Sequence, residues 1–439
     1  MKYNFLVLLS LGLSGSLSAS QDSTDFYVNL RSAQANGQQE ISKERLKSSQ
    51  LVTRIGMRYQ KNVTQNLLFD TDVRTVYEYG KYIEQSDSNA YLELKRLSVE
   101  IPSVFNTSLS TKIGRMTFRD KQTWWYDNEL DALKLFHKET LLSWDLSFAG
   151  RLSDERANAG DQRVSLEGSK YYIGHLDYHY YYQHHFEAFA MYEDNGQDKN
   201  TTGDVIDFEN RVVAYRKLSW LGARVYGEFS KRYSYWGNVA YVDGDTQNLG
   251  FTTNSSGLPE VTSINNISVS GIGLDFGFLY KAPGYGLGFS YAYGQGDNGK
   301  GSSQDLFLQP RTSNNKGYMF GATRYRYYGE MLDPQLSNIQ ILSLYAGIAI
   351  YGNVHLEFNY HKYAQNTAST QLRSSNLFIQ PNGLDTDIGQ GFDVILGGKF
   401  ENGQEVQLVI SGFYGGDAFS NISTKKDGYR AVIDYKLYW

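Results

Sequence analysis

The last thirteen residues of the chain, 427–439, place an apolar or aromatic side chain at every second position. Charged side chains, Arg430, Asp434 and Lys436, stand between them. Because neighbouring side chains of a β-strand point to opposite faces, one face of this segment is apolar and the other is charged. A membrane barrel accommodates both faces, since it turns one to lipid and the other to an aqueous interior. The segment ends at Trp439 without a tail, which suits a strand that closes such a barrel.

Runs with the same alternation recur along the chain, and we count about eighteen of them. An even number of strands of about ten residues is what an outer-membrane barrel requires. The predicted strands are Phe26–Arg31, Leu51–Lys61, Leu67–Gly80, Tyr91–Pro102, Ser108–Phe118, Asp131–Phe136, Leu142–Leu152, Tyr171–Tyr181, His185–Glu193, Glu209–Leu218, Ala223–Ser230, Val269–Tyr280, Tyr285–Tyr293, Ile339–Tyr351, His355–Lys362, Phe392–Phe400, Val406–Tyr414 and Asp427–Trp439.

The connections between these runs alternate in length. Short turns are predicted at Asn62–Asn66, Gln183–His185, Ala282–Gly284, Gly352–Asn353 and Glu401–Glu405. Long links are predicted at Ser32–Gln50, Ser153–Ser169, Tyr235–Asn266, Asp297–Ser337 and Ala364–Gly389. A periplasmic β-sandwich or solenoid would also alternate, but it would not show this order of short and long connections. The pattern therefore predicts an all-β fold, a transmembrane antiparallel β-barrel with short periplasmic turns and long extracellular loops.

The N-terminus has the pattern of a secretory signal peptide. Lys2 precedes the apolar run 5–13, and small residues follow through Ser20. We expect cleavage near Ala19 or Ser20, which gives a signal peptide at 1–20 and one barrel domain at 21–439. No later segment approaches eighteen apolar residues, so no spanning helix is expected. The predicted location is the outer membrane of a Gram-negative cell.

The composition excludes several kinds of function. The 439 residues include no cysteine, which removes disulfide and thiol chemistry. A net charge of −5 argues against nucleic acid as a partner. There is no G-x-S-x-G or H-E-x-x-H motif, and the seven histidines are better explained as lumen or rim residues than as metal ligands. We predict no enzyme activity and no cofactor, although an enzyme with a site at the rim of the same scaffold stays an alternative.

Basic residues recur at positions that the alternation turns to the lumen. They are Arg31, Arg54, Arg58, Arg74, Arg96, Arg151, Arg224, Lys399 and Arg430, with Lys112 less securely placed. Rings of arginine and lysine in a pore select anions. Acids face the same lumen, namely Asp70, Asp72, Glu100, Asp145, Glu228 and Asp393. In one interpretation, these acids hold the arginine side chains extended toward a passing anion. In the other, the acids and the bases only pair with one another and keep the channel hydrated.

Two stretches carry a family resemblance: KIGRMTFRDKQTWWYDNEL at 112–130 and NNKGYMFGATRYRYYGEMLDPQLSN at 314–338. Together with FDVILGG at 392–398 and GFYGGDAF at 412–419, they resemble the alginate-export outer-membrane porin family across the mature chain. The resemblance implies a monomeric barrel of eighteen strands. It also implies an arginine-rich constriction that passes an anionic polyuronate.

The resemblance adds basic residues to the predicted constriction. Arg115 of the GRMTF motif is similar to a pore-lining base, although strand register alone would turn it to lipid. We therefore expect a bulge near Gly114 that turns Arg115 inward. Arg324 and Arg326 are similar to basic residues of a long loop that folds into the lumen.

Supporting residues are implied in the same way. Glu330 or Asp333 would orient the two loop arginines, and the segment WWYD at 124–127 would form a structured loop that fixes the constriction. Aromatic packing and sugar stacking both remain open for that segment, and packing is the preferred interpretation.

One connection departs from the family pattern. The alginate exporter has a long periplasmic loop before its penultimate strand that is thought to gate the pore, whereas here residues 401–405 (ENGQE) form a tight turn. We predict an outer-membrane channel that passes an anionic polysaccharide or oligosaccharide, and a general or small-anion porin is the alternative. The expected partners are that saccharide, outer-membrane lipid and periplasmic secretion proteins. The direction of transport is left open.

Overall fold

The computed structural model describes residues 23–41, 44–64, 67–82, 85–104, 107–152, 168–181, 183–196, 201–204, 215–253, 259–297, 301–373, 375–377, 379–420 and 427–439. The predicted signal peptide lies outside the described residues. Residues 209–214, the first part of one predicted strand, also lie outside them.

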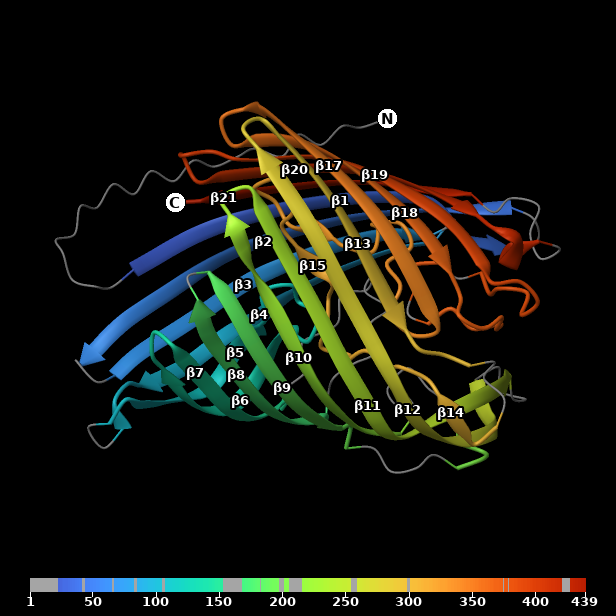
Figure 1. Cartoon of the computed structure of the whole chain (residues 1–439), viewed down its shortest axis with the longest axis horizontal. Helices are drawn as coiled ribbons and strands as arrows, with labels where there is room; N and C mark the ends of the chain where they lie inside the picture. The colour runs from blue at the N-terminus through green and yellow to red at the C-terminus, as the bar shows by residue number, and fades with distance from the viewer. Residues whose placement is uncertain are drawn as a thin grey trace.

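Within the described residues, eighteen long antiparallel strands form one closed wall (Figure 1). They are β1 (Ser23–Ile41), β2 (Glu44–Thr64), β3 (Leu67–Tyr82), β4 (Gln85–Ile101), β5 (Leu109–Arg119), β6 (Asp127–Lys138), β7 (Leu142–Gly150), β8 (Lys170–Tyr181), β9 (His184–Asp194), β10 (Arg216–Ser230), β11 (Tyr233–Thr253), β12 (Pro259–Ala282), β13 (Tyr285–Gly294), β17 (Ile339–Tyr351), β18 (Val354–Ala364), β19 (Asp387–Lys399), β20 (Gln404–Gly415) and β21 (Gly428–Tyr438). β1 pairs with both β2 and β21, so the sheet has no open edge at its seam. The predicted barrel and its strand number are confirmed.

The outer face of the wall is apolar, as the alternation predicts. In β21, Tyr429 and Ile433 are exposed, whereas Val432 between them is buried. Exposed side chains such as Ile55 and Leu146 continue this outer surface on other strands. A solvent-exposed apolar face of this extent is stable only against lipid.

The residues that the structure describes contain almost no helix. A short 3-10 turn covers η2 (Asp417–Phe419). In the part of the chain that the structure describes, no helix has the length and apolarity needed to cross a membrane.

The two ends of the barrel differ in their connections. Phe26 and Trp439 pair through their backbones at one end, with N to O distances of 2.9 and 3.0 Å. The same end carries tight turns at 283–284, 352–353 and 400–403. The opposite end carries the long connections 295–338 and 365–386.

Two of the predicted long links are wrong. Residues 32–50 are mostly strand, because β1 continues to Ile41 and β2 begins at Glu44. Residues 235–266 lie mostly in β11 and β12, which pair along almost their whole length. In β11 the inward residues Ala240 and Val242 are buried and apolar, so the strand lacks the alternation on which the prediction depended.

The strand number is nevertheless right, because one strand was missed and another was split. β11 lies in a predicted link, whereas Leu218 and Ala223, assigned to separate runs, both belong to β10.

Two connections of the long-loop end fold into the barrel. Residues 120–126 and much of 295–338 lie inside the wall, where Trp124, Phe307 and Tyr328 are buried (Figure 1). The second connection includes β14 (Ser303–Asp305) and a small hairpin of β15 (Lys316–Gly317) and β16 (Tyr325–Arg326).

The inner loops cover only part of the wall. We define the dry half of the lumen as the inward-facing side chains of β8–β13 and β17–β20, together with the inner segments 120–126 and 306–338. We define the wet half as the inward-facing side chains of β1–β4. Apolar residues such as Trp220, Val242 and Ile395 are buried in the dry half, whereas the wet half carries ion pairs that stay partly exposed.

Candidate functional site

Glycines of the dry half make room for the inner loops. A Cβ atom at Gly273 would overlap the ring of Phe307, and a Cβ atom at either Gly286 or Gly347 would overlap the ring of Phe320. Since interiors are close-packed, such rings fit only where the facing wall has no side chain. The loops are therefore accommodated by the wall sequence itself.

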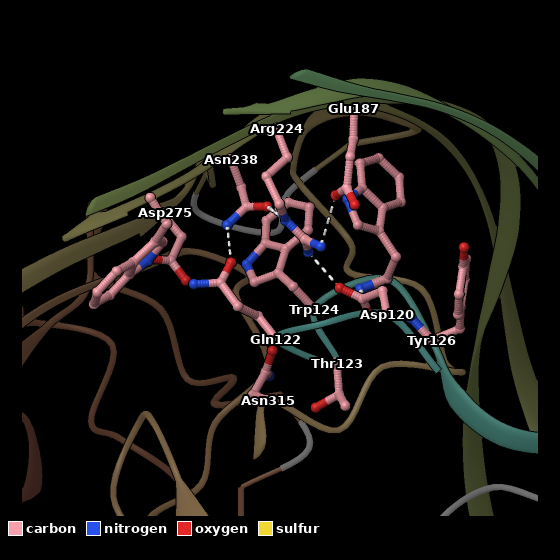
Figure 2. Close-up of polar contacts among 12 residues, drawn as sticks. Asp120, Gln122, Thr123, Trp124, Tyr126, Glu187, Arg224, Asn238, Asp275 and Asn315 are labelled. Atoms are coloured by element: carbon pink, nitrogen blue, oxygen red, sulfur yellow. Dashed lines mark hydrogen bonds and ion pairs between the residues drawn. The ribbon is translucent and has the colours of Figure 1, made fainter. Parts of the chain in front are cut away.

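Arg224 of β10 ties the first inner loop to the wall (Figure 2). Its fully buried guanidinium donates to Asn238 (Nε to Oδ1, 2.5 Å), to Glu187 (Nη1 to Oε2, 3.0 Å) and to Asp120. Asp120 in turn accepts from the backbone nitrogen of Trp125 at 3.2 Å. A buried cation with this many acceptors fixes the loop, since any displacement would leave charges unpaired.

The two inner loops are hydrogen-bonded to each other around Thr123 and Asn315. Both residues have positive φ angles, 52° and 51°, which non-glycine residues adopt mainly where the surroundings impose them. Thr123 exchanges two bonds with the backbone of Lys316 (2.7 and 2.9 Å). The amides of Gln309 and Asn315 bond each other at 2.7 and 3.1 Å. The two loops consequently form one unit.

The aromatic segment 124–127 is part of this unit. The ring of Trp125 stacks on Phe189 at 4.7 Å, and the ring of Trp124 stacks on Phe307 at 5.9 Å. Both tryptophans are buried, so neither offers a face to a sugar. The preferred interpretation, aromatic packing, is confirmed.

Buried wall carboxylates hold the second inner loop. Asp275 accepts from the hydroxyl of Tyr328 at 2.7 Å, and Glu357 accepts from the hydroxyl of Tyr325 at 2.8 Å. Burial raises the pKa of both tyrosine hydroxyls, so they remain donors at neutral pH. These bonds anchor the loop without a cation.

A third wall carboxylate, Asp393, stands in a triad-like row. Ser343 Oγ lies 2.8 Å from His361 Nδ1, and His361 Nε2 lies 3.3 Å from Asp393. All three side chains are at most 1% exposed, and Asp393 also accepts from the backbone nitrogen of Glu330. Asp393 therefore lies beneath the Glu330 segment and not on the accessible surface of the lumen. In the described part of the chain, no group of three or more His, Cys, Asp or Glu residues could hold a metal ion.

The wet half brings together three of the predicted arginines on neighbouring strands. The side chains of Arg58, Arg74 and Arg96 are 36%, 18% and 15% exposed. Arg74 binds Glu93 through two bonds, 2.9 and 2.6 Å, and Arg96 binds Asp72 at 3.0 Å. The acids hold these side chains extended along the wall while leaving them accessible.

Other predicted wall residues, in both halves of the lumen, also form pairs. Arg54 of β2 donates to a wall asparagine at 3.0 Å. Glu100 pairs with Lys112 at 3.6 Å, and Lys399 pairs with Glu405 at 3.4 Å. All of these pairs remain partly exposed.

Arg324 of the second inner loop and Arg119 at the end of β5 form a partly exposed basic pair. Arg324 and Arg119 share the buried carboxylate of Asp127, with Arg324 Nη2 at 3.2 Å from Oδ2. Their own side chains are 22% and 47% exposed, so two cations with one acid border the open space.

Arg326 is held by both acids that the resemblance implied, Glu330 (3.7 Å) and Asp333. Burial raises the pKa of Glu330, but the charges of Arg326, of Lys316 and, more weakly, of Arg430 and Arg31 outweigh burial and hold it below its usual range. Arg430 also donates to the Glu330 carbonyl at 3.3 Å. The loop therefore faces β1 and β21 at this point.

Arg115 lies at the last residue pair between β4 and β5, where the two strands separate. β5 pairs with β4 over five residue pairs that end at Arg115, and its pairing with β6 shows no register shift at Gly114, although Gly114 has a φ of 113°. Arg115 binds Asp131 at 2.9 and 2.7 Å and donates to the Leu94 carbonyl at 3.2 Å. The expected bulge is absent from the pairing, because the strand separates from its neighbour instead. Arg151 lies just beyond β7, where its charge acts on Asp131.

The sequence missed two bases of the channel surface. Lys95 of β4 pairs with Glu129 of β6 at 3.7 Å, across the space between two strands that are not neighbours. Lys95 lies in a register shift between β3 and β4, so alternation could not place it. Arg119 follows the GRMTF motif directly, and only the inward loop brings it to the lumen.

A closed barrel with an apolar outer face and a polar lumen narrowed by inner loops defines the class of outer-membrane channel proteins. Solved structures share this fold: Pseudomonas aeruginosa OccK5 (OpdH) superposes with a TM-score of 0.57 at 12% identity, covering 95% of this chain and 98% of that one. P. aeruginosa OccK2 (OpdF) in complex with glucuronate gives a TM-score of 0.53 at 10% identity, with 94% and 98% covered. At such identities the likeness shows the fold alone.

The chain belongs to the alginate export family, whose sequence profile matches residues 25–433. Alginate production protein AlgE of P. aeruginosa is 23% identical over 299 residues, 66% of this chain and 60% of that protein. AlgE of Pseudomonas syringae pv. tomato is 22% identical over 309 residues, 69% and 61%. The match thus spans about 60% of the length of these relatives. The predicted family and the outer-membrane location are confirmed, and the tight turns mark the periplasmic end.

Proposed function

We propose that this protein is a passive outer-membrane channel for an anionic polysaccharide of the alginate class, or for its oligomers. The observation that carries the proposal is the wet half of the lumen. There, the arginines of β2–β4 keep partly exposed guanidinium groups, and the partly exposed Arg119 and Arg324 add two further cations. Cationic side chains lining a pore favour anions, and arginine binds carboxylates through paired hydrogen bonds.

The ion pairs of the wet half give a physical route for passage. Each uronate carboxylate would replace a protein acid as the partner of one guanidinium, and the protein acid would reclaim that guanidinium as the chain moves on. Asp127 is suited to this exchange, because it is already shared between Arg119 and Arg324. Binding stays weak at each step, which conduction through several sites requires.

The dry half would serve as a fixed support. Its loops fill the lumen with packed side chains, so a single saccharide chain must run along the basic wall. Residues 400–403 form a tight turn between β19 and β20, so this connection does not supply a periplasmic gate. The channel lies within one barrel, and a monomer is sufficient for it.

Planar bilayer recordings test the proposal. We expect an anion-selective current that micromolar polyuronate blocks, and we expect Arg324→Glu and Arg115→Glu to lower selectivity and to weaken the block about tenfold, or ~1.4 kcal/mol. Lys217→Glu is the matched control, since Lys217 pairs with Asp194 on an exposed rim.

The alternatives give different results in the same recordings. A weakly selective current that polyuronate leaves unblocked would favour a general or small-anion porin. No current, with hydrolysis of a substrate at the rim, would favour an enzyme. Unchanged reversal potentials in both arginine variants would remove those residues from the constriction.

A further inference from the structure

Segments of two extracellular connections meet above the dry half and enclose a small cavity. The connection between β13 and β17 contributes residues near 297–306 and 337–338, and the connection between β18 and β19 contributes residues near 369–373. The cavity holds about 10 Å³ of free space, and its polar lining includes Asp297, Gln304, Ser337, Asn338, Ser369 and Arg373. This is close to the space that one water molecule needs, and a chloride ion is only slightly larger.

Two buried side chains of the lining have polar atoms without a partner. Gln304 is 1% exposed and Ser337 is 4% exposed. Among the described residues, neither Gln304 Nε2 nor Ser337 Oγ has a hydrogen-bond partner. Leaving a buried donor unsatisfied costs about 1–3 kcal/mol, so native structures rarely do so without a bound group.

The neighbouring polar groups are already occupied. Asn338 exchanges two bonds with the backbone of Thr367, at 2.8 and 3.0 Å. Ser369 Oγ accepts from a backbone nitrogen at 3.2 Å, and Asp297 accepts from the backbone nitrogen of Asp305 at 3.1 Å. The two side chains that remain unsatisfied in the cavity can both donate, Gln304 through Nε2 and Ser337 through its hydroxyl.

The charges around the cavity also favour a bound anion. Burial and the nearby charge of Arg216 lower the pKa of Arg373 to about 10, and Asp297 opposes this effect. Arg373 is thus still a cation at neutral pH. Arg216 is paired with Glu193 (3.1 Å), which is also paired with Arg311 (2.5 Å). Two acids therefore face three arginines in this region.

We propose that this cavity binds one small monovalent anion of the size of chloride, through Gln304 Nε2, the Ser337 hydroxyl and the Arg373 guanidinium. Sulfate, phosphate and a uronate ring exceed the space. A water molecule fits as well, but it would leave Asp297 as the one acid of the lining that faces Arg373. The bound anion would join the connection between β13 and β17 to the connection between β18 and β19. Halide in the medium should therefore stabilise the protein against unfolding. The site does not depend on what passes through the channel.

The test uses the full-length protein in detergent micelles, with sodium bromide as the probe. We expect crystals grown in bromide to give an anomalous peak in this cavity. We also expect a higher Tm in chloride or bromide than in gluconate at equal ionic strength, and loss of this difference in Gln304→Glu and Ser337→Ala. Gln380→Glu makes the same chemical change at an exposed position and should keep the halide effect.

Three results would overturn the proposal. The first is a cavity without an anomalous peak and a wild-type Tm that does not depend on halide. The second is a peak at this site in the Gln304→Glu variant as strong as in the wild type, since a donor is then not needed. The third is stabilisation of Gln304→Glu by calcium chloride beyond that given by sodium chloride, which would make the cavity a cation site.

Discussion

Arg224 in the dry half and Arg74 in the wet half both bind carboxylates, yet the side chain of Arg224 is 0% exposed and that of Arg74 is 18% exposed. The buried arginine fixes a loop, because nothing from outside can take the place of Asp120 or Glu187. The exposed arginine can exchange its partner for a solute carboxylate. An arginine–carboxylate pair therefore fixes a loop in the dry half, whereas in the wet half it can bind a solute.

Both halves contain shared ion pairs. In the dry half, Arg224 serves two acids, and Glu193 serves two arginines. In the wet half, Arg96 serves two acids, and beside this half Asp127 of β6 serves two arginines. The halves therefore differ in how far their ion pairs are exposed, not in how many partners each charge has.

The largest effect is expected from Arg224→Met, which tests whether the buried ion pairs act as a lock. Removing the cation leaves Asp120 and Glu187 buried without it, which should cost about 3–5 kcal/mol of unfolding free energy. The first inner loop should also detach and raise the single-channel conductance. Guanidinium unfolding in micelles and bilayer recordings measure the two effects.

The matched control is Arg58→Met in the wet half. The side chain of Arg58 is 36% exposed, and its contact with Asp70 is 3.6 Å, so the loss of stability should be about 1 kcal/mol or less. If both variants lose the same free energy, the distinction between the two halves fails.

The next effect is expected from Gly286→Ala. The added methyl group overlaps the ring of Phe320, and overpacking of this kind costs about 1–3 kcal/mol. The double variant with Phe320→Ala should lose less free energy than the sum of the two single variants, since the methyl then has room. Gly237→Ala is the control, because a Cβ there makes an ordinary contact of 3.6 Å with Val225. Additive losses in the double variant would show that the loop does not lie on this wall.

Tyr328→Phe tests the anchoring of the loop by a buried acid. The hydroxyl donates to Asp275 at 2.7 Å and accepts from the indole of Trp124 at 3.1 Å, so its removal should cost about 1–3 kcal/mol. Tyr351→Phe changes the same group at an exposed position and should cost nothing measurable. Equal stability of the two variants would mean that the carboxylate does not hold the loop.

The contrast between the halves also explains what the sequence could predict. Alternation arises where a strand separates lipid from water, so it identified the wet-half positions of Arg58, Arg74 and Arg96. It failed for β11, because a loop distant in sequence covers Ala240 and Val242 and removes the polar side of the pattern.

The same physical cause limits the prediction of single residues. Asp393 stands at a strand position whose side chain points into the barrel, but the segment around Glu330 covers it. Lys95 reaches the lumen only through a register shift. Both outcomes depend on long-range packing, which local patterns do not contain.

The smallest effect concerns Glu330, which belongs to the inner loop but senses the charges of Lys316, of Arg430 on β21 and of Arg31 in the wet half. Those charges and that of Arg326 hold its pKa below the ordinary value of about 4.3 despite burial. A carboxyl group with a lowered pKa contributes stability that is complete above the unfolded-state pKa and is lost as pH falls through the folded-state pKa. The difference in unfolding free energy between the wild type and Glu330→Gln should therefore be constant from pH 8 to about pH 5 and shrink below it. A difference that instead grows as the pH falls would mean that burial outweighs the arginines, and that the wet half does not reach this loop.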